Sequence, residues 1–427
     1  MKHIFNKQTF AWALYDWANS AFITSVVVVF YPMLLQEYWN HDVSSGTRTF
    51  QLGIANAIAS ITVLVISPVL GSISDTSSAK KKFLMFFMLV GALATVGLYF
   101  VEQGNWFMAL FIFVLGNIGF AGGNTFYDSL LVAVGKKADY DSISAFGFAV
   151  GYLGGGLLLV VNFAMATWPA YFGFDSSLHA ARFAFITVAV WWVLFSIPLF
   201  IYVKEPTKVA KGGIISNIGP GLRQLKNTFR EIRNLKVVGT FLLAYFLYID
   251  GVDTIIKMAN DFAIAMKLDP VKLIGAFLVT QFIGFPAAII YGMIGRRVGI
   301  KQAIMFGVFA YGGVTIYATQ MDSVAEFYAL AIVIGLIQGG VQSLSRSLYA
   351  RIIPGNKAGE FFGFYNMLGK FAAILGPLLV GMMAKLTENP QLSILSLILL
   401  FIGGGVLLAR VDLQEGERMA HELEKRH

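Results

Sequence analysis

Apolar segments long enough to cross a lipid bilayer recur along almost the whole chain, and they restrict the fold more than any other feature. A hydrocarbon core of about 30 Å is crossed by roughly 20 residues of α-helix. We expect twelve such spans, at residues 10–33, 48–71, 83–101, 106–134, 143–166, 183–203, 237–260, 271–293, 302–319, 324–349, 360–384 and 391–410. A transmembrane barrel would need alternating polarity, which these segments lack. The sequence therefore predicts an all-α integral membrane protein.

The basic residues indicate the orientation of these helices. The net charge of +8 is spread through short segments between apolar runs and is not gathered into one domain, so we expect no nucleic-acid partner. If the connecting segments are assigned alternately to the two sides of the membrane, 25 of the 32 Lys and Arg residues lie on the side of the N-terminus. Positively charged loops stay in the cytoplasm. We expect a multi-pass protein of the cytoplasmic membrane with both termini in the cytoplasm.

The longest connection divides the predicted spans into two groups of six. The expected organisation is an N-terminal six-helix half (1–203), a cytoplasmic linker (204–236), a C-terminal six-helix half (237–410) and a cytoplasmic tail (411–427). In the linker, apolar residues recur every three or four positions with Arg and Lys between them, which predicts an amphipathic helix on the membrane surface. The alternative is a solvated basic linker.

The two halves contain traces of a repeat. Gly71, Asp75 and Lys80 after the second span have counterparts in Gly292, Arg296 and Lys301 after the eighth, at an offset of 221 residues. Two pseudo-symmetric halves are typical of transporters that alternate about a site near the bilayer midplane. In the first copy, Gly71 would allow close helix approach, and Asp75 could cap a neighbouring helix end in one conformation. We assign both a gating role; a plain positively charged turn is the alternative.

Three blocks carry a resemblance to a known family. The first copy of the repeat resembles the cytoplasmic loop between helices two and three of the major facilitator superfamily. The segments WALYDWANSAF at 12–22, GGVQSLSRSLYARIIP at 339–354 and FFGFYNMLGKFAAILGPLLVG at 361–381 resemble its vacuole-effluxer branch, the autophagy-related amino-acid effluxers of fungi and their bacterial relatives. The resemblance runs from the first span to the twelfth. It implies a secondary transporter with the major facilitator fold, and amino-acid efflux as its activity.

Polar residues within the spans form stripes that would face a central path. Helical spacing places residues three, four or seven positions apart on one face. The residues assigned to substrate or ion coupling are Asp16, Asn19, Asn124, Asp250, Gln338, Gln342, Asn366 and Lys370, and Asp128 and Arg346, nearer the cytoplasmic ends of their spans, are assigned to gating. Charges at such depth are costly and usually face a cavity or the interior of the bundle.

Depth separates their expected roles. At 1.5 Å per residue, Lys370 lies near the midplane, whereas Asp16 and Asn19 lie in the cytoplasmic third of the first span. We expect Lys370 to bind a substrate carboxylate, and Asp250 or Asp16 to face an amino group or carry a proton. Alternatively, Lys370 and an aspartate neutralise each other as a structural pair.

Two of these aspartates also suggest a different class of protein. Tyr15-Asp16 and Asp250-Gly251-Val252-Asp253 resemble the two-aspartate arrangement of intramembrane aspartyl proteases, but the second block lacks that family's first Gly. A channel, a sensor, or an exporter of another metabolite or drug remain alternatives to amino-acid efflux. The chain has no Cys and no nucleotide-binding motif, so we expect no metal or cofactor. The transporter interpretation also implies that the protein is not an enzyme. The expected partners are a small-molecule substrate, a coupling proton and membrane lipid, with the protein acting as a monomer.

Overall fold

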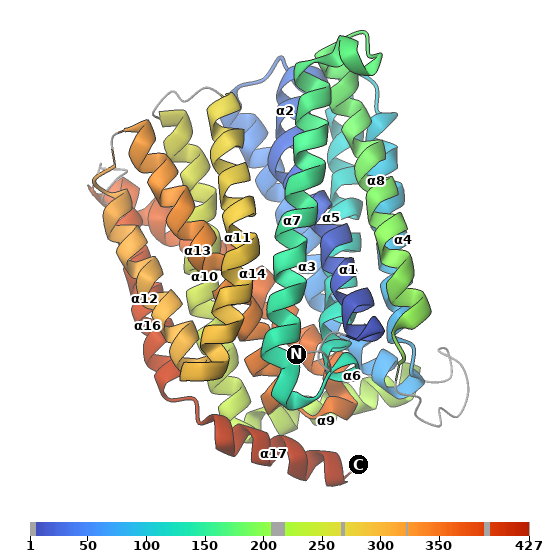
Figure 1. The fold of residues 1–427 in the computed structure, drawn as a ribbon, viewed down its shortest axis with the longest axis vertical. Coiled ribbons are helices and arrows are strands. Elements are labelled where there is room, and N and C mark those ends of the chain that lie inside the picture. The colour runs from blue at the N-terminus through green and yellow to red at the C-terminus, as the bar shows by residue number, and fades with distance from the viewer. Residues whose placement is uncertain (1–5, 206–217, 266–269, 322, 388–392, 427) are drawn as a thin grey trace.

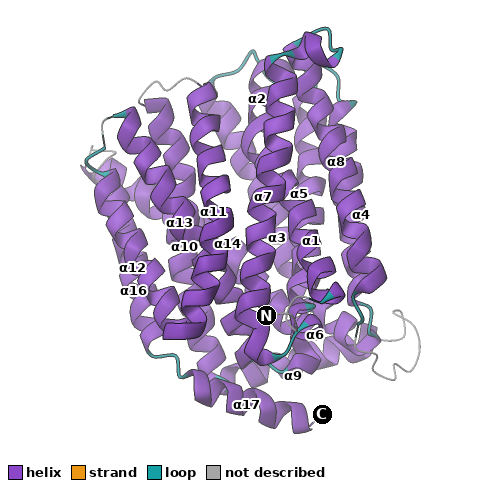
Figure 2. Cartoon of the chain, viewed as in Figure 1, coloured by secondary structure: helices purple, strands orange, loops and turns teal. Residues whose placement is uncertain are grey.

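The computed structural model describes residues 6–205, 218–265, 270–321, 323–387 and 393–426, and within them helices are the regular structure and no strand occurs. Long helices run roughly side by side (Figures 1 and 2). Ten helices of the described part are long and apolar enough to span a membrane. With α12 (Ile300–Ala318) and the last segment before the tail (Leu395–Ala409), the described part contains twelve long helical segments, the number that the sequence predicts.

The first six segments, called the N-half below, follow the predicted spans closely. They are α1 Lys7–Ala21 continued by π-helices Phe22–Phe30 and Leu35–Trp39 around α2 Tyr31–Leu34, α3 Ser45–Ser77, α4 Lys80–Tyr99, α5 Trp106–Ser129 with α6 Leu131–Val134, α7 Tyr140–Thr167, and α8 Ser177–Tyr202. Helix α8 begins before the predicted residue 183. It can include Arg182 because that guanidinium donates to the carbonyl of Tyr99 and lies over the rings of Tyr38 and Tyr99.

The second six segments, called the C-half, repeat this pattern. They are α10 Lys236–Ala265, α11 Pro270–Val298, α12 Ile300–Ala318, α13 Val324–Ile352, α14 Ala358–Thr387, and the short 3-10 turn Leu395–Leu397 leading into α16 Ile398–Ala409. The predicted start of the twelfth span, 391–392, lies outside the described residues. Pro68, Pro198, Pro286 and Pro377 are tolerated inside these helices.

The repeat read from the sequence has a structural counterpart. Ser78, after α3, and Gly299, after α11, both have positive φ, at 49° and 103°. They are separated by the same 221 residues as the glycines and lysines of the motif. In both halves, a lysine just after this loop binds the end of the last helix of that half. Lys81 donates to the carbonyls of Phe200 and Val203, and Lys301 donates to those of Ala409 and Val411.

Two further helices lie at the end of the bundle where α1 begins. Within the predicted linker, α9 spans Ile218–Asn234, and the tail forms α17, Leu413–Arg426. Figure 1 shows both across this end, which we call the linker end; the opposite end is the far end. Helix α17 is not fully exposed: it buries Ala420 and packs Leu413, Met419 and Leu423 against the bundle.

Candidate functional site

A buried arginine joins the two halves near the linker end. Arg346 is on α13, 3% exposed, and its guanidinium lies between carboxylates of the N-half. Nη1 is 3.0 Å from Asp128 Oδ1 on α5, and Nη2 is 3.3 Å from Asp16 Oδ2 on α1. Nε and Nη2 also donate to the hydroxyl and carbonyl of Ser144 on α7, at 2.8 and 3.1 Å. One C-half side chain is therefore bound to three N-half helices.

Neighbouring groups complete what we call the Arg346 cluster, which comprises Asp16, Tyr127, Asp128, Ser144, Arg346 and Asn366. The Tyr127 hydroxyl donates to Asp16 at 2.7 Å, and the Asn366 amide donates to Asp128 at 3.1 Å. The guanidinium also lies 4.8 Å from the ring of Trp12 and 4.4 Å from that of Phe148. Aromatic faces attract a cation strongly where water is excluded.

The Arg346 cluster contains more acidic than basic groups. It holds two carboxylates and one guanidinium, so it carries one excess negative charge when both aspartates are ionised. Buried charges need close partners and further hydrogen bonds to offset their desolvation. The Asp16 side chain keeps 14% exposure, whereas that of Arg346 keeps 3%. Asp16 is therefore the member of this pair that solvent reaches more readily.

Further polar residues lie on the far side of the cluster. Asn19 and Asn124 are hydrogen bonded at 2.7 Å, and Tyr152 reaches Gln342 at 3.5 Å across the interface between the halves. Lys370 Nζ is 5.9 Å from the ring centre of Phe120 on α5. Asn124, Gln338, Gln342 and Lys370 are all partly exposed although they lie within helices of the bundle. The chain thus places amide and ammonium groups together beyond the buried arginine.

Asp250 has a different setting from the other predicted site residues. Its side chain is fully buried in the C-half, where α10 meets α14. A Cβ atom built on Gly376 would lie 3.0 Å from Asp250 Oδ1, so the carboxylate packs against that helix. Asp253, one turn further along α10, is partly exposed.

A second contact across the interface is formed by the Asp75 motif. The Asp75 carboxylate accepts hydrogen bonds from the backbone N–H groups of Gly359 and Glu360, at 3.0 and 2.8 Å, in the first turn of α14. Lys80 Nζ is 2.9 Å from the same carboxylate. Gly71 has no room for a side chain, because a Cβ there would overlap the Gly359 carbonyl. Asp75 thus caps a helix of the opposite half, the kind of contact expected from the sequence.

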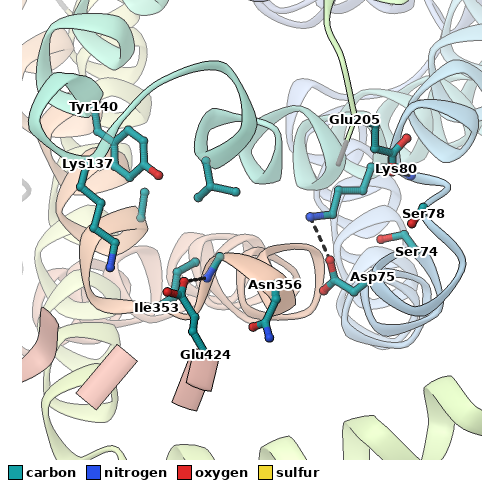
Figure 3. Close-up of a pocket in the computed structure, with 13 residues that line it drawn as sticks. Ser74, Asp75, Ser78, Lys80, Lys137, Tyr140, Glu205, Ile353, Asn356 and Glu424 are labelled. Carbon is teal, nitrogen blue, oxygen red and sulfur yellow. Dashed lines mark hydrogen bonds and ion pairs between the residues drawn. The ribbon is translucent and has the colours of Figure 1, made fainter. Parts of the chain in front are cut away.

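A cavity of about 300 Å³ adjoins this contact at the linker end. Figure 3 shows Asp75 and Lys80 paired on one side of it, with Asn356 and Glu424 nearby. Glu424 of α17 accepts from the N–H of Gly355 at 2.6 Å, between α13 and α14.

Sequence reasoning missed part of this interface. Asp141 on α7 accepts hydrogen bonds from Arg351, at 2.8 Å, and from the Ser347 hydroxyl, also at 2.8 Å. Arg351 and Ser347 follow Arg346 along α13 within the quoted block at 339–354, so their position in that block was the available signal. Tyr127 precedes Asp128 directly and was passed over because a tyrosine in a span ordinarily indicates packing.

Comparisons with known proteins identify the class. The model of the family described as "Vacuole effluxer Atg22 like" matches residues 47–138 and 133–421, and the chain belongs to this family. It is a multi-pass transporter of the major facilitator type. The chain is 37% identical to the MFS-type transporter YxiO of Bacillus subtilis (strain 168), over 95% of each chain. It is 23% identical to Autophagy-related protein 22 of Saccharomyces cerevisiae (strain S288c), over 96% of this chain and 93% of the relative.

Solved structures agree on the fold. The proton:xylose symporter XylE has a TM-score of 0.72 at 15% identity, covering 97% of this chain and 99% of the symporter. The human organic anion transporter MFSD10 has a TM-score of 0.73 at 15% identity, covering 94% and 99%. Family and fold are those of transporters and not of enzymes, so the protease alternative is wrong. Consistently, Asp16 is paired with Arg346, whereas Asp250 packs inside the C-half.

Proposed function

We propose that the protein exports amino acids, or chemically similar small metabolites, by alternating access, with the linker end facing the cytoplasm and closed in this structure. The main observation behind this proposal is the Arg346 cluster, which binds α13 of one half to α1, α5 and α7 of the other. The contacts of Asp75 with α14 and of Asp141 with Arg351 support closure at the same end. The excess of basic residues on this side supports its cytoplasmic orientation.

The proposed substrate site lies beyond this gate. Lys370 would bind a carboxylate, and Asn19, Asn124, Gln338 and Gln342 would supply amide donors and acceptors. Asn366, which donates to Asp128 of the gate, would lie at the border between the two. The resemblance to fungal amino-acid effluxers supports the choice of amino acids; another small metabolite or a drug is the second candidate. Because Asp16 is paired with Arg346 in the gate, we assign it proton exchange rather than the amino-group contact.

The charge balance of the cluster supports proton coupling. With two carboxylates and one guanidinium, the cluster becomes neutral on accepting one proton. Protonation of Asp16 would weaken its attraction to Arg346 and so favour opening of the linker end. Asp16→Asn should therefore impair coupling to a pH gradient more than it impairs substrate binding.

Reconstitution tests this proposal. The purified protein would be placed in liposomes and screened with labelled amino acids, with and without a pH gradient. Saturable transport of amino acids that depends on the gradient is expected. Transport of another metabolite class alone would refute the substrate assignment, and gradient-independent transport would refute the coupling.

Lys370→Ala tests the carboxylate contact within the same assay. We expect apparent affinity for an amino acid to fall at least about tenfold, the effect of losing roughly 1.4 kcal/mol of binding free energy. Lys385→Ala is the matched control, because Lys385 is an exposed lysine on the same helix. Unchanged affinity in Lys370→Ala would leave Lys370 with a purely structural role.

A further inference from the structure

The linker helix α9 connects the two halves at the gate. The Ser72 hydroxyl of α3 donates to the carbonyl of Gly221 at 2.8 Å, and the Gln224 amide donates to Glu360 of α14 at 2.9 Å. These partners belong to the region of the Asp75 contact. Ser72 directly follows Gly71, and the backbone N–H of Glu360 donates to the Asp75 carboxylate. Helix α9 therefore bridges the same two helices that Asp75 joins.

Close packing holds α9 in this position. A Cβ atom on Gly221 would lie 2.8 Å from Ile73 Cγ1 and 3.1 Å from Ile73 Cα, so only glycine permits this approach to α3. The apolar part of α3 covers Phe50–Ser77, 28 residues, whereas the hydrocarbon core needs roughly 20. If α3 is centred in the bilayer, Ile73 lies where the helix leaves the hydrocarbon. Helix α9 thus lies at the level of the lipid headgroups.

One side of α9, next to the face that meets α3, suits that level. Ile218 and Leu222, one turn apart, are 42% and 47% exposed. Arg223 and Lys226 are also exposed and lie on the adjacent side of the helix. An apolar strip bordered by basic side chains is what an interfacial helix presents to a membrane that contains anionic lipid.

From these observations we propose that α9 binds anionic phospholipid headgroups through Arg223 and Lys226, and that this binding stabilises the closed linker end. Lipid that holds α9 against the membrane also holds its contacts with α3 and α14 in place. A basic residue near an anionic surface contributes about 1 kcal/mol, which corresponds to about fivefold in an equilibrium. The inference rests on the alternating access proposed above.

Spin labels can measure this effect because the chain contains no native cysteine. Lys136→Cys in the N-half and Arg297→Cys in the C-half place labels at exposed positions of the linker end. Distances between them would be recorded by double electron–electron resonance in phosphatidylcholine vesicles with and without phosphatidylglycerol. We expect phosphatidylglycerol to raise the population of the short, closed distance.

Charge variants test the role of α9 in this response. Arg223→Gln with Lys226→Gln should reduce the lipid effect about fivefold for each charge removed. Lys82→Gln with Lys425→Gln removes two other exposed charges and should preserve it. The inference is overturned if phosphatidylglycerol has no effect on the distances, or if the two double variants respond alike. Absent transport in every lipid, with a lipid-dependent distance, would count against the transport proposal alone.

Discussion

At the scale of single residues, Arg346 combines two properties that a gate requires. Its planar guanidinium presents five N–H donors in a fixed fork, whereas a lysine offers three donors on one compact ammonium group. It binds Asp16, Asp128 and Ser144 simultaneously, and each belongs to a different N-half helix. Under the alternating-access proposal, these contacts would all break together when the helices separate.

Replacing Arg346 by alanine should lower the stability of the protein and abolish transport. In Arg346→Ala, Asp16 and Asp128 would remain with no cation between them, and breaking a buried ion pair from one side costs about 3–5 kcal/mol. We expect a lower melting temperature in detergent and loss of transport in liposomes.

The triple variant separates stability from function. Adding Asp16→Asn and Asp128→Asn to Arg346→Ala removes the uncompensated charges, so thermal stability should recover while transport does not. If the triple variant remained as unstable as the single one, packing around Trp12 and Phe148 rather than charge would explain the loss.

Asp75 should stabilise the closed linker end through its contact with the first turn of α14. Asp75→Ala removes the acceptor for two N–H groups of α14 and the partner of Lys80, and losing a helix cap costs about 1–2 kcal/mol. We expect a larger open population at the linker end, measured with the spin-label pair described above. Asp412→Ala is a suitable control, because Asp412 caps only the exposed start of α17. Equal distance distributions in the two variants would contradict a gating role for Asp75.

At the scale of helices, glycines determine how closely the halves approach. Helices α3 and α14 meet through Gly71, Gly359 and Gly363, and a Cβ on Gly363 would lie 2.8 Å from Pro68 Cα. Since backbone cannot yield as a flexible side chain does, a larger residue here must separate the helices. Under the alternating-access proposal, this small-residue contact belongs to the closed linker end.

Gly363→Leu should push the linker end open. Overpacking of this kind costs about 1–3 kcal/mol, and opening relieves it. Labelling of an introduced cysteine at Asn366 by a reagent added from the linker side should become faster. Gly381→Leu is the matched control on the same helix, because nothing lies within 4 Å of a Cβ there. Equal labelling rates in the two variants would show that the contact does not limit opening.

At the scale of the whole molecule, the sequence predicted the helices better than the interface between them. Spans follow from length and apolarity, which are local properties, and the repeat of Gly71 and Gly292 was visible as a fixed offset. Which carboxylate faces Arg346 depends on helix rotation and packing, so the sequence could not show that Asp16 and Asp128 bind it while Asp250 packs against α14. Asp141 was not predicted because it lies just outside the expected span 143–166, and Tyr127 because a tyrosine in a span ordinarily indicates packing.

The repeat makes a prediction about how the halves move. Gly71 approaches α14 of the C-half, and Gly292 approaches α7 of the N-half, where its Cβ would lie 2.5 Å from that of Ala145. Disulfides need Cβ atoms about 3.5–4.5 Å apart, so a small shift would accommodate a bridge between these positions. Ala145→Cys with Gly292→Cys should therefore form a disulfide on mild oxidation, in a chain with no other cysteine.

That disulfide should stop transport reversibly. If the halves must separate at the linker end in every cycle, oxidation would abolish uptake in liposomes and a reductant would restore it. Each single-cysteine variant should transport equally under both conditions. Full transport by the cross-linked protein, with cross-linking verified by mass spectrometry, would mean that α7 and α11 stay together throughout the cycle. Opening would then have to occur elsewhere, between α3 and α14.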